Sequence, residues 1–203
     1  MNNDYSYQYK DDNDIYCYKG TNVLKNRLNI TDAEILKNAE RELSMARYYF
    51  LEKSNIEGDF SLKMLQYIHK ELFQDIYEWA GEIRKVDIAK GTIFCLVPFI
   101  ENQFETIHHW LSVRNYLSEQ TCKAQYVHEL AYVLGEINMV HPFREGNGRT
   151  QRLYMEKLVE KNGRFELHFD KSSKEEMVYA SVRSSVCDYK PMEDLFFKCL
   201  CYK

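Results

Sequence analysis

Apolar residues recur every three to four positions through most of this chain, which is the spacing of one face of an α-helix. The 203 residues include only 8 glycines and 3 prolines. A β-sandwich or β-barrel needs a turn about every eight to twelve residues, and such turns use more of both residue types. The pattern therefore predicts an all-α, mainly helical fold.

Helix start and stop signals divide the chain into successive elements. The first helix should begin at a capping box formed by Thr31 and Glu34. A proline disfavours helical geometry in the residue before it, so Pro142 should end a helix near His141. The helices expected from these signals cover residues 31–53, 62–81, 100–118, 123–140, 150–161, 173–186 and 191 onward.

Residues 82–99 break the helical pattern. They are rich in β-favouring residues and are interrupted by Lys90 and Gly91. This arrangement predicts a short β-hairpin with its tip near Lys90–Thr92.

We expect one domain. Residues 150–161 are apolar on most faces, and a helix of that kind is buried at the centre of a fold. Residues 1–20 are rich in Asn, Asp and Tyr without periodicity, and they should form a loose N-terminal arm that packs locally through its tyrosines. No stretch rich in Pro, Gly or Ser divides the rest, so residues 21–203 should form a single domain.

Charge and cysteine usage limit the partners and the compartment. The net charge of −4 argues against a strongly basic nucleic-acid-binding protein. No run of 18 apolar residues is present, so no membrane span is expected. The six cysteines show no CxxC pair, and free thiols indicate a reducing compartment. The polar N-terminus lacks a Sec-type signal, so we expect a cytoplasmic protein, with export by another signal left open.

The chemistry is concentrated in residues 141–152, HPFREGNGRTQR. The run Gly146–Gly148 can expose successive backbone N–H groups, and the helix that follows adds positive potential from its N-terminus. Arg149 and Arg152 are three residues apart and lie on one face of that helix. Together these groups predict a pocket for several phosphates.

Glu145 places a carboxylate beside this pocket, where it can hold Mg²⁺ together with substrate phosphates. His141, at the end of the preceding helix, can accept a proton from an attacking hydroxyl. Each feature alone more often caps a helix, makes a turn or faces solvent. Their joint occurrence predicts phosphoryl or nucleotidyl transfer, in which positioning and charge neutralisation supply most of the acceleration.

These residues resemble the motif of the Fic family, HPFx(D/E)GNGRxxR, and match every fixed position from His141 to Arg152. The resemblance extends upstream over Phe60–Gly91 and downstream over Asp188–Phe196. Residues 18–28 are similar to the lead-in of bacterial Fic proteins related to host-targeted effectors. The resemblance implies a helical Fic fold with a central motif helix, a hairpin flap and a core of about residues 55–200.

The resemblance also implies an adenylyltransferase that moves AMP from ATP to a Tyr, Ser or Thr hydroxyl of a target protein and releases pyrophosphate. It makes His141 the general base and Glu145 the Mg²⁺ ligand. It assigns anion binding to Gly146, Asn147 (side chain included) and Gly148, and ATP phosphate binding to Arg149 and Arg152. The hairpin should dock the target by strand pairing, through Lys90, Gly91, Thr92, Ile93 and Phe94.

Other nucleotide chemistry on the same site stays open. Relatives of the Doc type carry a lysine at the position of Gly148 and phosphorylate their targets, so Gly148 favours AMP transfer. The alternatives are phosphotransfer, UMP transfer, removal of AMP, or an inhibited toxin module that acts mainly through protein contacts.

Regulation follows from the same resemblance. Many Fic proteins are blocked by a helix with the motif (S/T)xxxE(G/N), whose Glu pairs with the second motif arginine, here Arg152. Ser54 and Glu57 are one residue closer in sequence than this motif requires. Ser172 and Glu176 have the required spacing, but no Gly or Asn follows Glu176. The resemblance therefore implies inhibition by a small, separate antitoxin-like protein.

Overall fold

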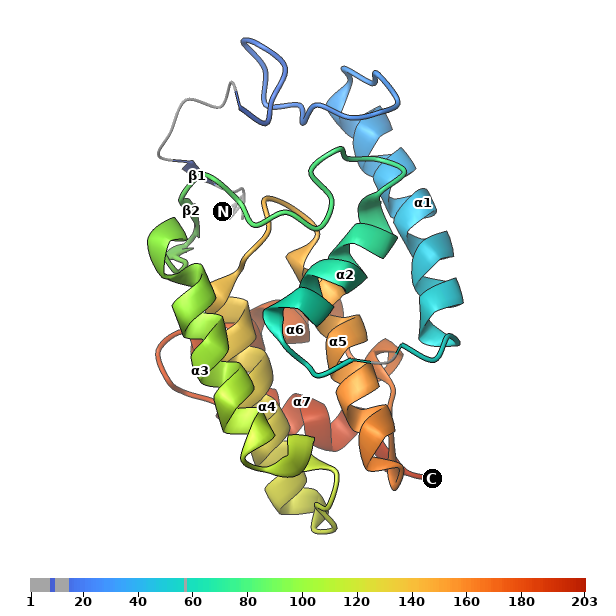
Figure 1. Cartoon of the computed structure of the whole chain (residues 1–203), viewed down its shortest axis with the longest axis vertical. Coiled ribbons are helices and arrows are strands. Elements are labelled where there is room, and N and C mark those ends of the chain that lie inside the picture. Colours follow the sequence, from blue (N-terminus) through green and yellow to red (C-terminus); the bar gives the residue numbers. More distant parts are fainter. Residues whose placement is uncertain (1–7, 10–14, 57) are drawn as a thin grey trace.

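The structure, a computed structural model, describes residues 8–9, 15–56 and 58–203. Within these ranges it contains seven α-helices and two small antiparallel sheets, so the predicted mainly helical fold with a hairpin is confirmed (Figure 1). The helices are α1 (Ala33–Glu52), α2 (Leu62–Phe73), α3 (Ile100–Ser112), α4 (Lys123–Val140), α5 (Asn147–Asn162), α6 (Lys174–Ser184) and α7 (Lys190–Cys199). The strands are β1 (Gln8–Tyr9), β2 (Ile88–Lys90), β3 (Thr92–Ile93), β4 (Phe165–Leu167) and β5 (Leu200–Tyr202).

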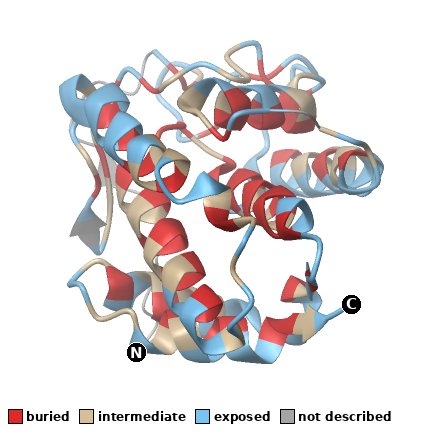
Figure 2. Cartoon of the chain, turned by 60° about the horizontal axis from the view of Figure 1, so that its bottom comes forward, coloured by how far each residue is buried: buried red, intermediate tan, exposed pale blue. Residues whose placement is uncertain are grey.

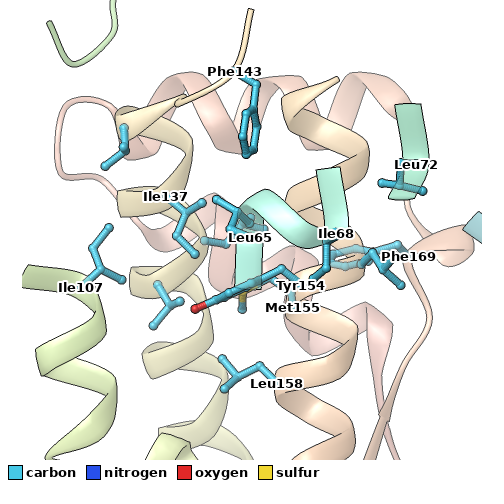
Figure 3. Close-up of a cluster of buried hydrophobic side chains, with 14 of the residues drawn as sticks. Leu65, Ile68, Leu72, Ile107, Ile137, Phe143, Tyr154, Met155, Leu158 and Phe169 are labelled. Carbon is cyan, nitrogen blue, oxygen red and sulfur yellow. The ribbon is translucent and has the colours of Figure 1, made fainter. Parts of the chain in front are cut away.

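The centre of the fold is α5, which packs against α1, α2 and α4. Buried residues form stripes along the inward faces of the helices (Figure 2). Tyr154, Met155 and Leu158 of α5 meet apolar side chains such as Leu65 of α2 and Ile137 of α4 (Figure 3). Burying one large apolar side chain contributes roughly 1.5–3 kcal/mol, so this cluster dominates the stability of the domain. The prediction of a central, buried motif helix is confirmed.

Lys157 places a buried charge on the same helix. The residue is 5% exposed. Its Nζ donates to the carbonyls of Glu52 and Ser54 at the end of α1, at 2.8 and 2.7 Å, and pairs with Glu160 at 2.8 Å. Carbonyls at a helix C-terminus lack partners within the helix and carry partial negative charge. Lys157 therefore fixes the end of α1 against α5.

The N-cap of α1 is Asp32. Its Oδ1 accepts hydrogen bonds from the backbone N–H groups of Glu34 and Ile35, both at 2.9 Å. The capping box predicted for Thr31 and Glu34 is therefore wrong by one residue. A carboxylate is favoured at this position for two reasons. It accepts hydrogen bonds from two backbone N–H groups that lack partners within the helix, and it lies at the positive end of the helix dipole.

The second helix is shorter than predicted, because α2 ends at Phe73 and the chain turns back over it before Gly81. The φ angle of Gly81 is +87°, and its N–H donates to Nδ1 of His69 at 2.8 Å. A β-carbon at Gly81 would lie 2.9 Å from the β-carbon of Lys70. The close approach of the two backbones therefore requires glycine here. The chain makes this turn where the prediction had continued the helix.

Two more boundaries differ from the prediction. The helix expected over residues 100–118 ends at Ser112, and Asn115–Leu117 takes left-handed φ angles of 48–58°. This backbone is unfavourable for residues with a β-carbon, and Leu117 is buried there. The motif helix begins at Asn147 rather than Thr150, so the first motif residues lie in its N-terminal turn.

The hairpin prediction is confirmed, with Gly91 at the turn between β2 and β3. A third strand was not predicted: β1 pairs antiparallel with β2, which gives the order β1-β2-β3. The sheet of β4 and β5 was also not predicted, since each strand has only three residues.

Only part of the predicted loose arm can be compared with the structure, because residues 1–7 and 10–14 lie outside the described residues. Tyr16 and Cys17 are buried, at 5% and 1% exposure, and the Tyr16 ring meets Trp79 edge-on. That part of the arm is therefore packed onto the domain. The limits of the single domain stay a prediction. Every helix of the described residues is too short or too polar to cross a bilayer.

Replacing Asp32 by Ala should lower the free energy of unfolding by about 1 kcal/mol, since two N–H groups at the start of α1 lose their acceptor. Urea unfolding of the whole chain measures this change. Thr31→Ala is the matched control and should leave the unfolding midpoint unchanged. An equal loss from both substitutions would contradict the assignment of Asp32 as the N-cap.

Candidate active site

His141 follows α4 in a left-handed backbone conformation, with φ +46° and ψ +60°. Its N–H closes the helix by donating to the carbonyl of Ile137 at 3.1 Å. The imidazole stacks on the ring of Phe94, which follows β3, with centroids 3.8 Å apart and an interplanar angle of 16°. The residue is 6% exposed. The end of α4 and the hairpin thus fix the ring together.

The hydrogen bonding of His141 determines its tautomer. Nδ1 lies 3.0 Å from the carbonyl oxygen of Asn138, and because a carbonyl only accepts, Nδ1 must carry the hydrogen. The basic lone pair is therefore on Nε2. The pKa of His141 is lowered to about 3, mainly by burial and in smaller part by the positive charges of Arg84 and Lys90. The ring is consequently neutral at physiological pH and able to accept a proton.

The loop after His141 is closed by the side chain of Asn147. Its Oδ1 accepts from the N–H of Phe143 at 3.0 Å, and its Nδ2 donates to the carbonyl of the same residue at 2.7 Å. Asn147 is 1% exposed. Both polar groups of this side chain are thus used to hold the loop, whereas the resemblance assigned the side chain to anion binding.

His69 of α2 packs against the loop and binds its backbone. Gly81 donates to its Nδ1, so Nε2 must carry the hydrogen and donate to the carbonyl of Glu145 at 2.9 Å. The imidazole stacks on Phe143, with centroids 3.9 Å apart. Burial lowers the pKa of His69 to about 3, which keeps this tautomer neutral. His69 therefore fixes the backbone that carries Glu145.

A cavity of about 820 Å³ opens above this loop. Its walls come from α1, the hairpin, α4, the start of α5, and α6 with the segment before it. Of the residues singled out from the sequence, those that line it are His141, Glu145, Gly146, Gly148, Arg149, Arg152, Lys90 and Phe94. The structure therefore brings the motif and the hairpin base to one cavity.

Three of the predicted residues, Asn147, Gly91 and Ile93, are absent from the described lining of the cavity. Asn147 is buried within the loop, Gly91 lies between the paired residues Lys90 and Thr92, and Ile93 is 51% exposed. The side chain of Thr92 lies outside the described part of the structure, so its predicted role stays a prediction.

Arg149 is held by α1. Its guanidinium pairs with the Glu40 carboxylate, donates to the Ser44 hydroxyl and lies over the ring of Phe73, 4.8 Å from its centroid. Burial raises the pKa of Glu145, and the nearby Glu40 carboxylate raises it further, against Arg149 and the Gly146 N–H. This N–H donates to Oε1 of Glu145 at 2.9 Å. Two carboxylates thus face one arginine, and an added cation would stabilise them.

A second acidic group, Glu156, lies one turn beyond Arg152 on α5. The pKa of Glu156 is raised to about 7, mainly by burial and also by the Glu52 carboxylate, against the opposing effects of Tyr48 and Arg152. Its Oε2 has no hydrogen-bond partner among the described residues. Glu156 therefore lines the cavity as a carboxyl that is only partly ionised at neutral pH.

Sequence reasoning missed the groups that hold the motif residues. Glu40, Ser44 and Tyr48 lie about 100 positions before their partners and carry no local signal. His69 and Arg84 fall within Phe60–Gly91, the stretch that the resemblance covers, but neither was given a role. No local spacing reports such contacts, because they form only when α1, α2 and the hairpin pack around α5.

Comparison with known proteins agrees with this site. Residues 59–159 match the Fic/DOC family. A probable protein adenylyltransferase from Sinorhizobium fredii is 34% identical over 180 residues, which covers 88% of this chain and 92% of that protein. The chain belongs to the Fic/DOC family. The probable protein adenylyltransferase Fic of Escherichia coli K12 is also 34% identical, over 91% of both chains.

Solved Fic structures share the fold. The N-terminal Fic domain of a VirB-translocated Bep effector from Bartonella quintana, with bound ADP, has a TM-score of 0.88 and 28% identity over 94% of this chain and 96% of that chain. The BepC protein of Bartonella tribocorum, with bound AMPPNP, has a TM-score of 0.86 and 27% identity over 93% and 97%. The Fic resemblance predicted from the motif is confirmed.

The two motif glycines should respond differently to alanine. At Gly146, φ is +81° and a β-carbon would lie 2.4 Å from the Phe73 ring, whereas at Gly148 it would meet only Nη1 of Arg152, at 3.5 Å. Gly146→Ala should cost about 2 kcal/mol or more in the free energy of unfolding, through backbone strain and overpacking. Gly148→Ala should leave it unchanged or raise it by up to about 1 kcal/mol, since alanine favours helix.

Urea unfolding of the two variants beside the unsubstituted protein measures this contrast. Equal unfolding midpoints for the two variants would show that the loop is looser than its packing against Phe73 indicates.

Proposed function

We propose that this Fic chain is a protein adenylyltransferase, which transfers AMP from ATP to a Tyr, Ser or Thr hydroxyl of a target protein. The supporting observation is the placement of His141, a neutral imidazole that lines the same cavity as the N-terminus of α5 and two arginines. The relatives named as adenylyltransferases, and the neighbouring structures with AMPPNP and ADP, support the same activity.

In the reaction, the target hydroxyl gives its proton to Nε2 of His141 as its oxygen attacks the α-phosphorus of ATP. A new phosphorus–oxygen bond forms to the target, the bond to the β-phosphate bridging oxygen breaks, and pyrophosphate leaves with the electron pair. A bound triphosphate raises the pKa of the imidazole by adding negative charge, so the base is stronger in the complex than in the free protein.

The phosphates would lie at the start of α5. The first N–H groups of a helix have no partner within it, and they favour anions together with the helix dipole. Gly146, Asn147 and Gly148 contribute this backbone, while Arg149 and Arg152 contribute guanidinium groups that bind phosphate oxygens in pairs.

The site also suits Mg²⁺. No three His, Cys, Asp or Glu side chains gather around one point in the part of the chain that the structure describes. Mg²⁺ commonly takes one or two protein carboxylates and completes its shell with phosphates and water. Glu145 would hold the ion, because it lines the cavity beside the start of α5, with the Glu40 carboxylate near it. The ion supplies charge neutralisation on the polyphosphate.

The hairpin residues Lys90 to Phe94 would dock the target by main-chain pairing. In the described residues, the outer edge of β2 is already paired with β1. The edge of β3 is therefore the one that we assign to the target strand. Pairing there places the target beside Phe94, whose ring stacks on His141.

We place the reaction in the cytoplasm of its own cell or of a host cell. The free cysteines favour a reducing compartment. The Bartonella structures with the same fold come from translocated effectors, which supports export as the second route.

His141→Ala should lower the labelling of target protein from ATP labelled at the α-phosphate by a factor of about 10² to 10⁴, because the attacking hydroxyl loses its base. The γ-label should not be transferred by either protein. His109→Ala removes an exposed imidazole on α3 and should keep full activity. Labelling that survives in the His141 variant, or transfer of the γ-label, would contradict the proposal.

We further propose that a small antitoxin-like protein inhibits this chain in trans. The two partial inhibitory motifs support this view, since Glu176 caps α6 and pairs with Lys198 instead of Arg152, and Glu57 lies outside the described residues. Arg152 is left as the target of an external carboxylate.

Expression with the neighbouring genes of its own genome should yield a co-purifying partner that lowers AMP transfer at least about tenfold. Arg152→Lys, which keeps the charge but loses paired recognition, should weaken the inhibition. Full activity of the purified chain with no partner recovered would exclude this form of regulation.

A further inference from the structure

Arg84 is a buried positive charge between the hairpin and the end of α4. Its side chain has no exposed surface. A guanidinium carries five N–H donors in a rigid plane. Burying an ion costs several kcal/mol unless polar groups surround it, so the partners of this group explain its position.

The partners come from both sides of the site. Nε donates to the carbonyl of His141 at 2.8 Å, and Nη2 lies 3.5 Å from the carbonyl of Val140. On the hairpin side, the carbonyl of Val86 accepts from Nη1 at 2.8 Å, and that of Cys95 accepts from Nη2. Asp87, also on the hairpin side, supplies a carboxylate 3.6 Å from Nη1.

The backbone strengthens the same connection. The N–H of Arg84 donates to the carbonyl of Pro142, and the N–H of Cys95 donates to the carbonyl of Met139, both at 2.9 Å. Because Cys95 follows β3 while Val86 precedes β2, both legs of the hairpin are tied to residues 139–142. One side chain therefore spans the base of the hairpin and the backbone of His141.

We propose that Arg84 is a positioning residue for AMP transfer, which holds the target-docking hairpin and His141 in one fixed arrangement. The proposal rests on the function assigned above. His141 has a left-handed backbone that is unfavourable for a residue with a β-carbon, and the bond from Arg84 to its carbonyl stabilises it. The distance from a docked hydroxyl to the imidazole is then set through Arg84.

The contacts separate this role from nucleotide binding. Among the described residues, the hydrogen bonds of the Arg84 guanidinium go to the hairpin and to the end of α4, and none goes to α5. Loss of Arg84 should therefore slow transfer while the phosphate-binding end of α5 keeps its affinity. A lysine has three donors on one nitrogen and cannot span both sides, and a glutamine removes the charge as well.

The test compares Arg84→Lys and Arg84→Gln with the unsubstituted protein. Arg47→Gln, which breaks a surface ion pair with Asp75, is the matched control and should behave as the unsubstituted protein. Three quantities are measured: the turnover rate of AMP transfer to the target, the Kd for AMPPNP with Mg²⁺, and amide hydrogen exchange at Cys95, His141 and α5.

We expect the turnover rate to fall about 100-fold in Arg84→Gln and about tenfold in Arg84→Lys, since a misplacement of about 1 Å costs roughly 10² in rate. The Kd for AMPPNP should change less than about threefold. Exchange should accelerate at Cys95 and His141 and stay slow in α5.

An unchanged rate in Arg84→Gln would overturn the proposal. So would a parallel loss of rate, AMPPNP affinity and α5 protection in Arg84→Lys, since this would show a purely structural residue. If Arg84→Gln does not fold, the lysine variant decides. If the unsubstituted chain transfers no AMP, the proposed function fails, and hydrogen exchange alone then tests whether Arg84 joins the hairpin to His141.

Discussion

Two hydrogen bonds between the side chain of Asn147 and the backbone of Phe143 close the loop that joins α4 to α5. They fold the loop back onto the first turn of α5 and direct the ring of Phe143 onto His69. A buried loop carries polar backbone groups that must find partners, and an amide side chain supplies a donor and an acceptor at once. His141 before the loop and Glu145 within it take their places from this closure.

Groups of the protein itself offset part of the charge around the loop. Glu40 and Ser44 hold Arg149, and the Glu145 carboxylate accepts the N–H of Gly146. Burial nevertheless opposes ionisation of Glu145 and protonation of His141. A polyphosphate with its divalent ion would favour protonation of His141 and ionisation of Glu145, because it adds negative charge near the imidazole and positive charge near the carboxylate.

The hairpin is too small to be stable alone, since three very short strands bury little apolar surface. Its position depends on contacts at its base, where Arg84 binds backbone carbonyls and Phe94 stacks on His141. The tip at Gly91 carries no such contact with the cavity. This division suits a docking element, because the edge that meets a partner can adapt while the end near the base stays fixed.

The sequence alone determined the helical fold, the hairpin and the segment of residues 141–152, since each of these is encoded by local spacing. It placed α4 without error, because the apolar period and Pro142 act within a few residues. It misplaced the start of α5, since a GNG run is typical of a loop and only the bonds of Asn147 to Phe143 draw it into the helix. Tertiary structure alone decided the stacking of Phe94 on His141, the pairing of Arg149 with Glu40 and the bond from Arg84 to the His141 carbonyl, because each joins groups that meet only after the helices and the hairpin pack.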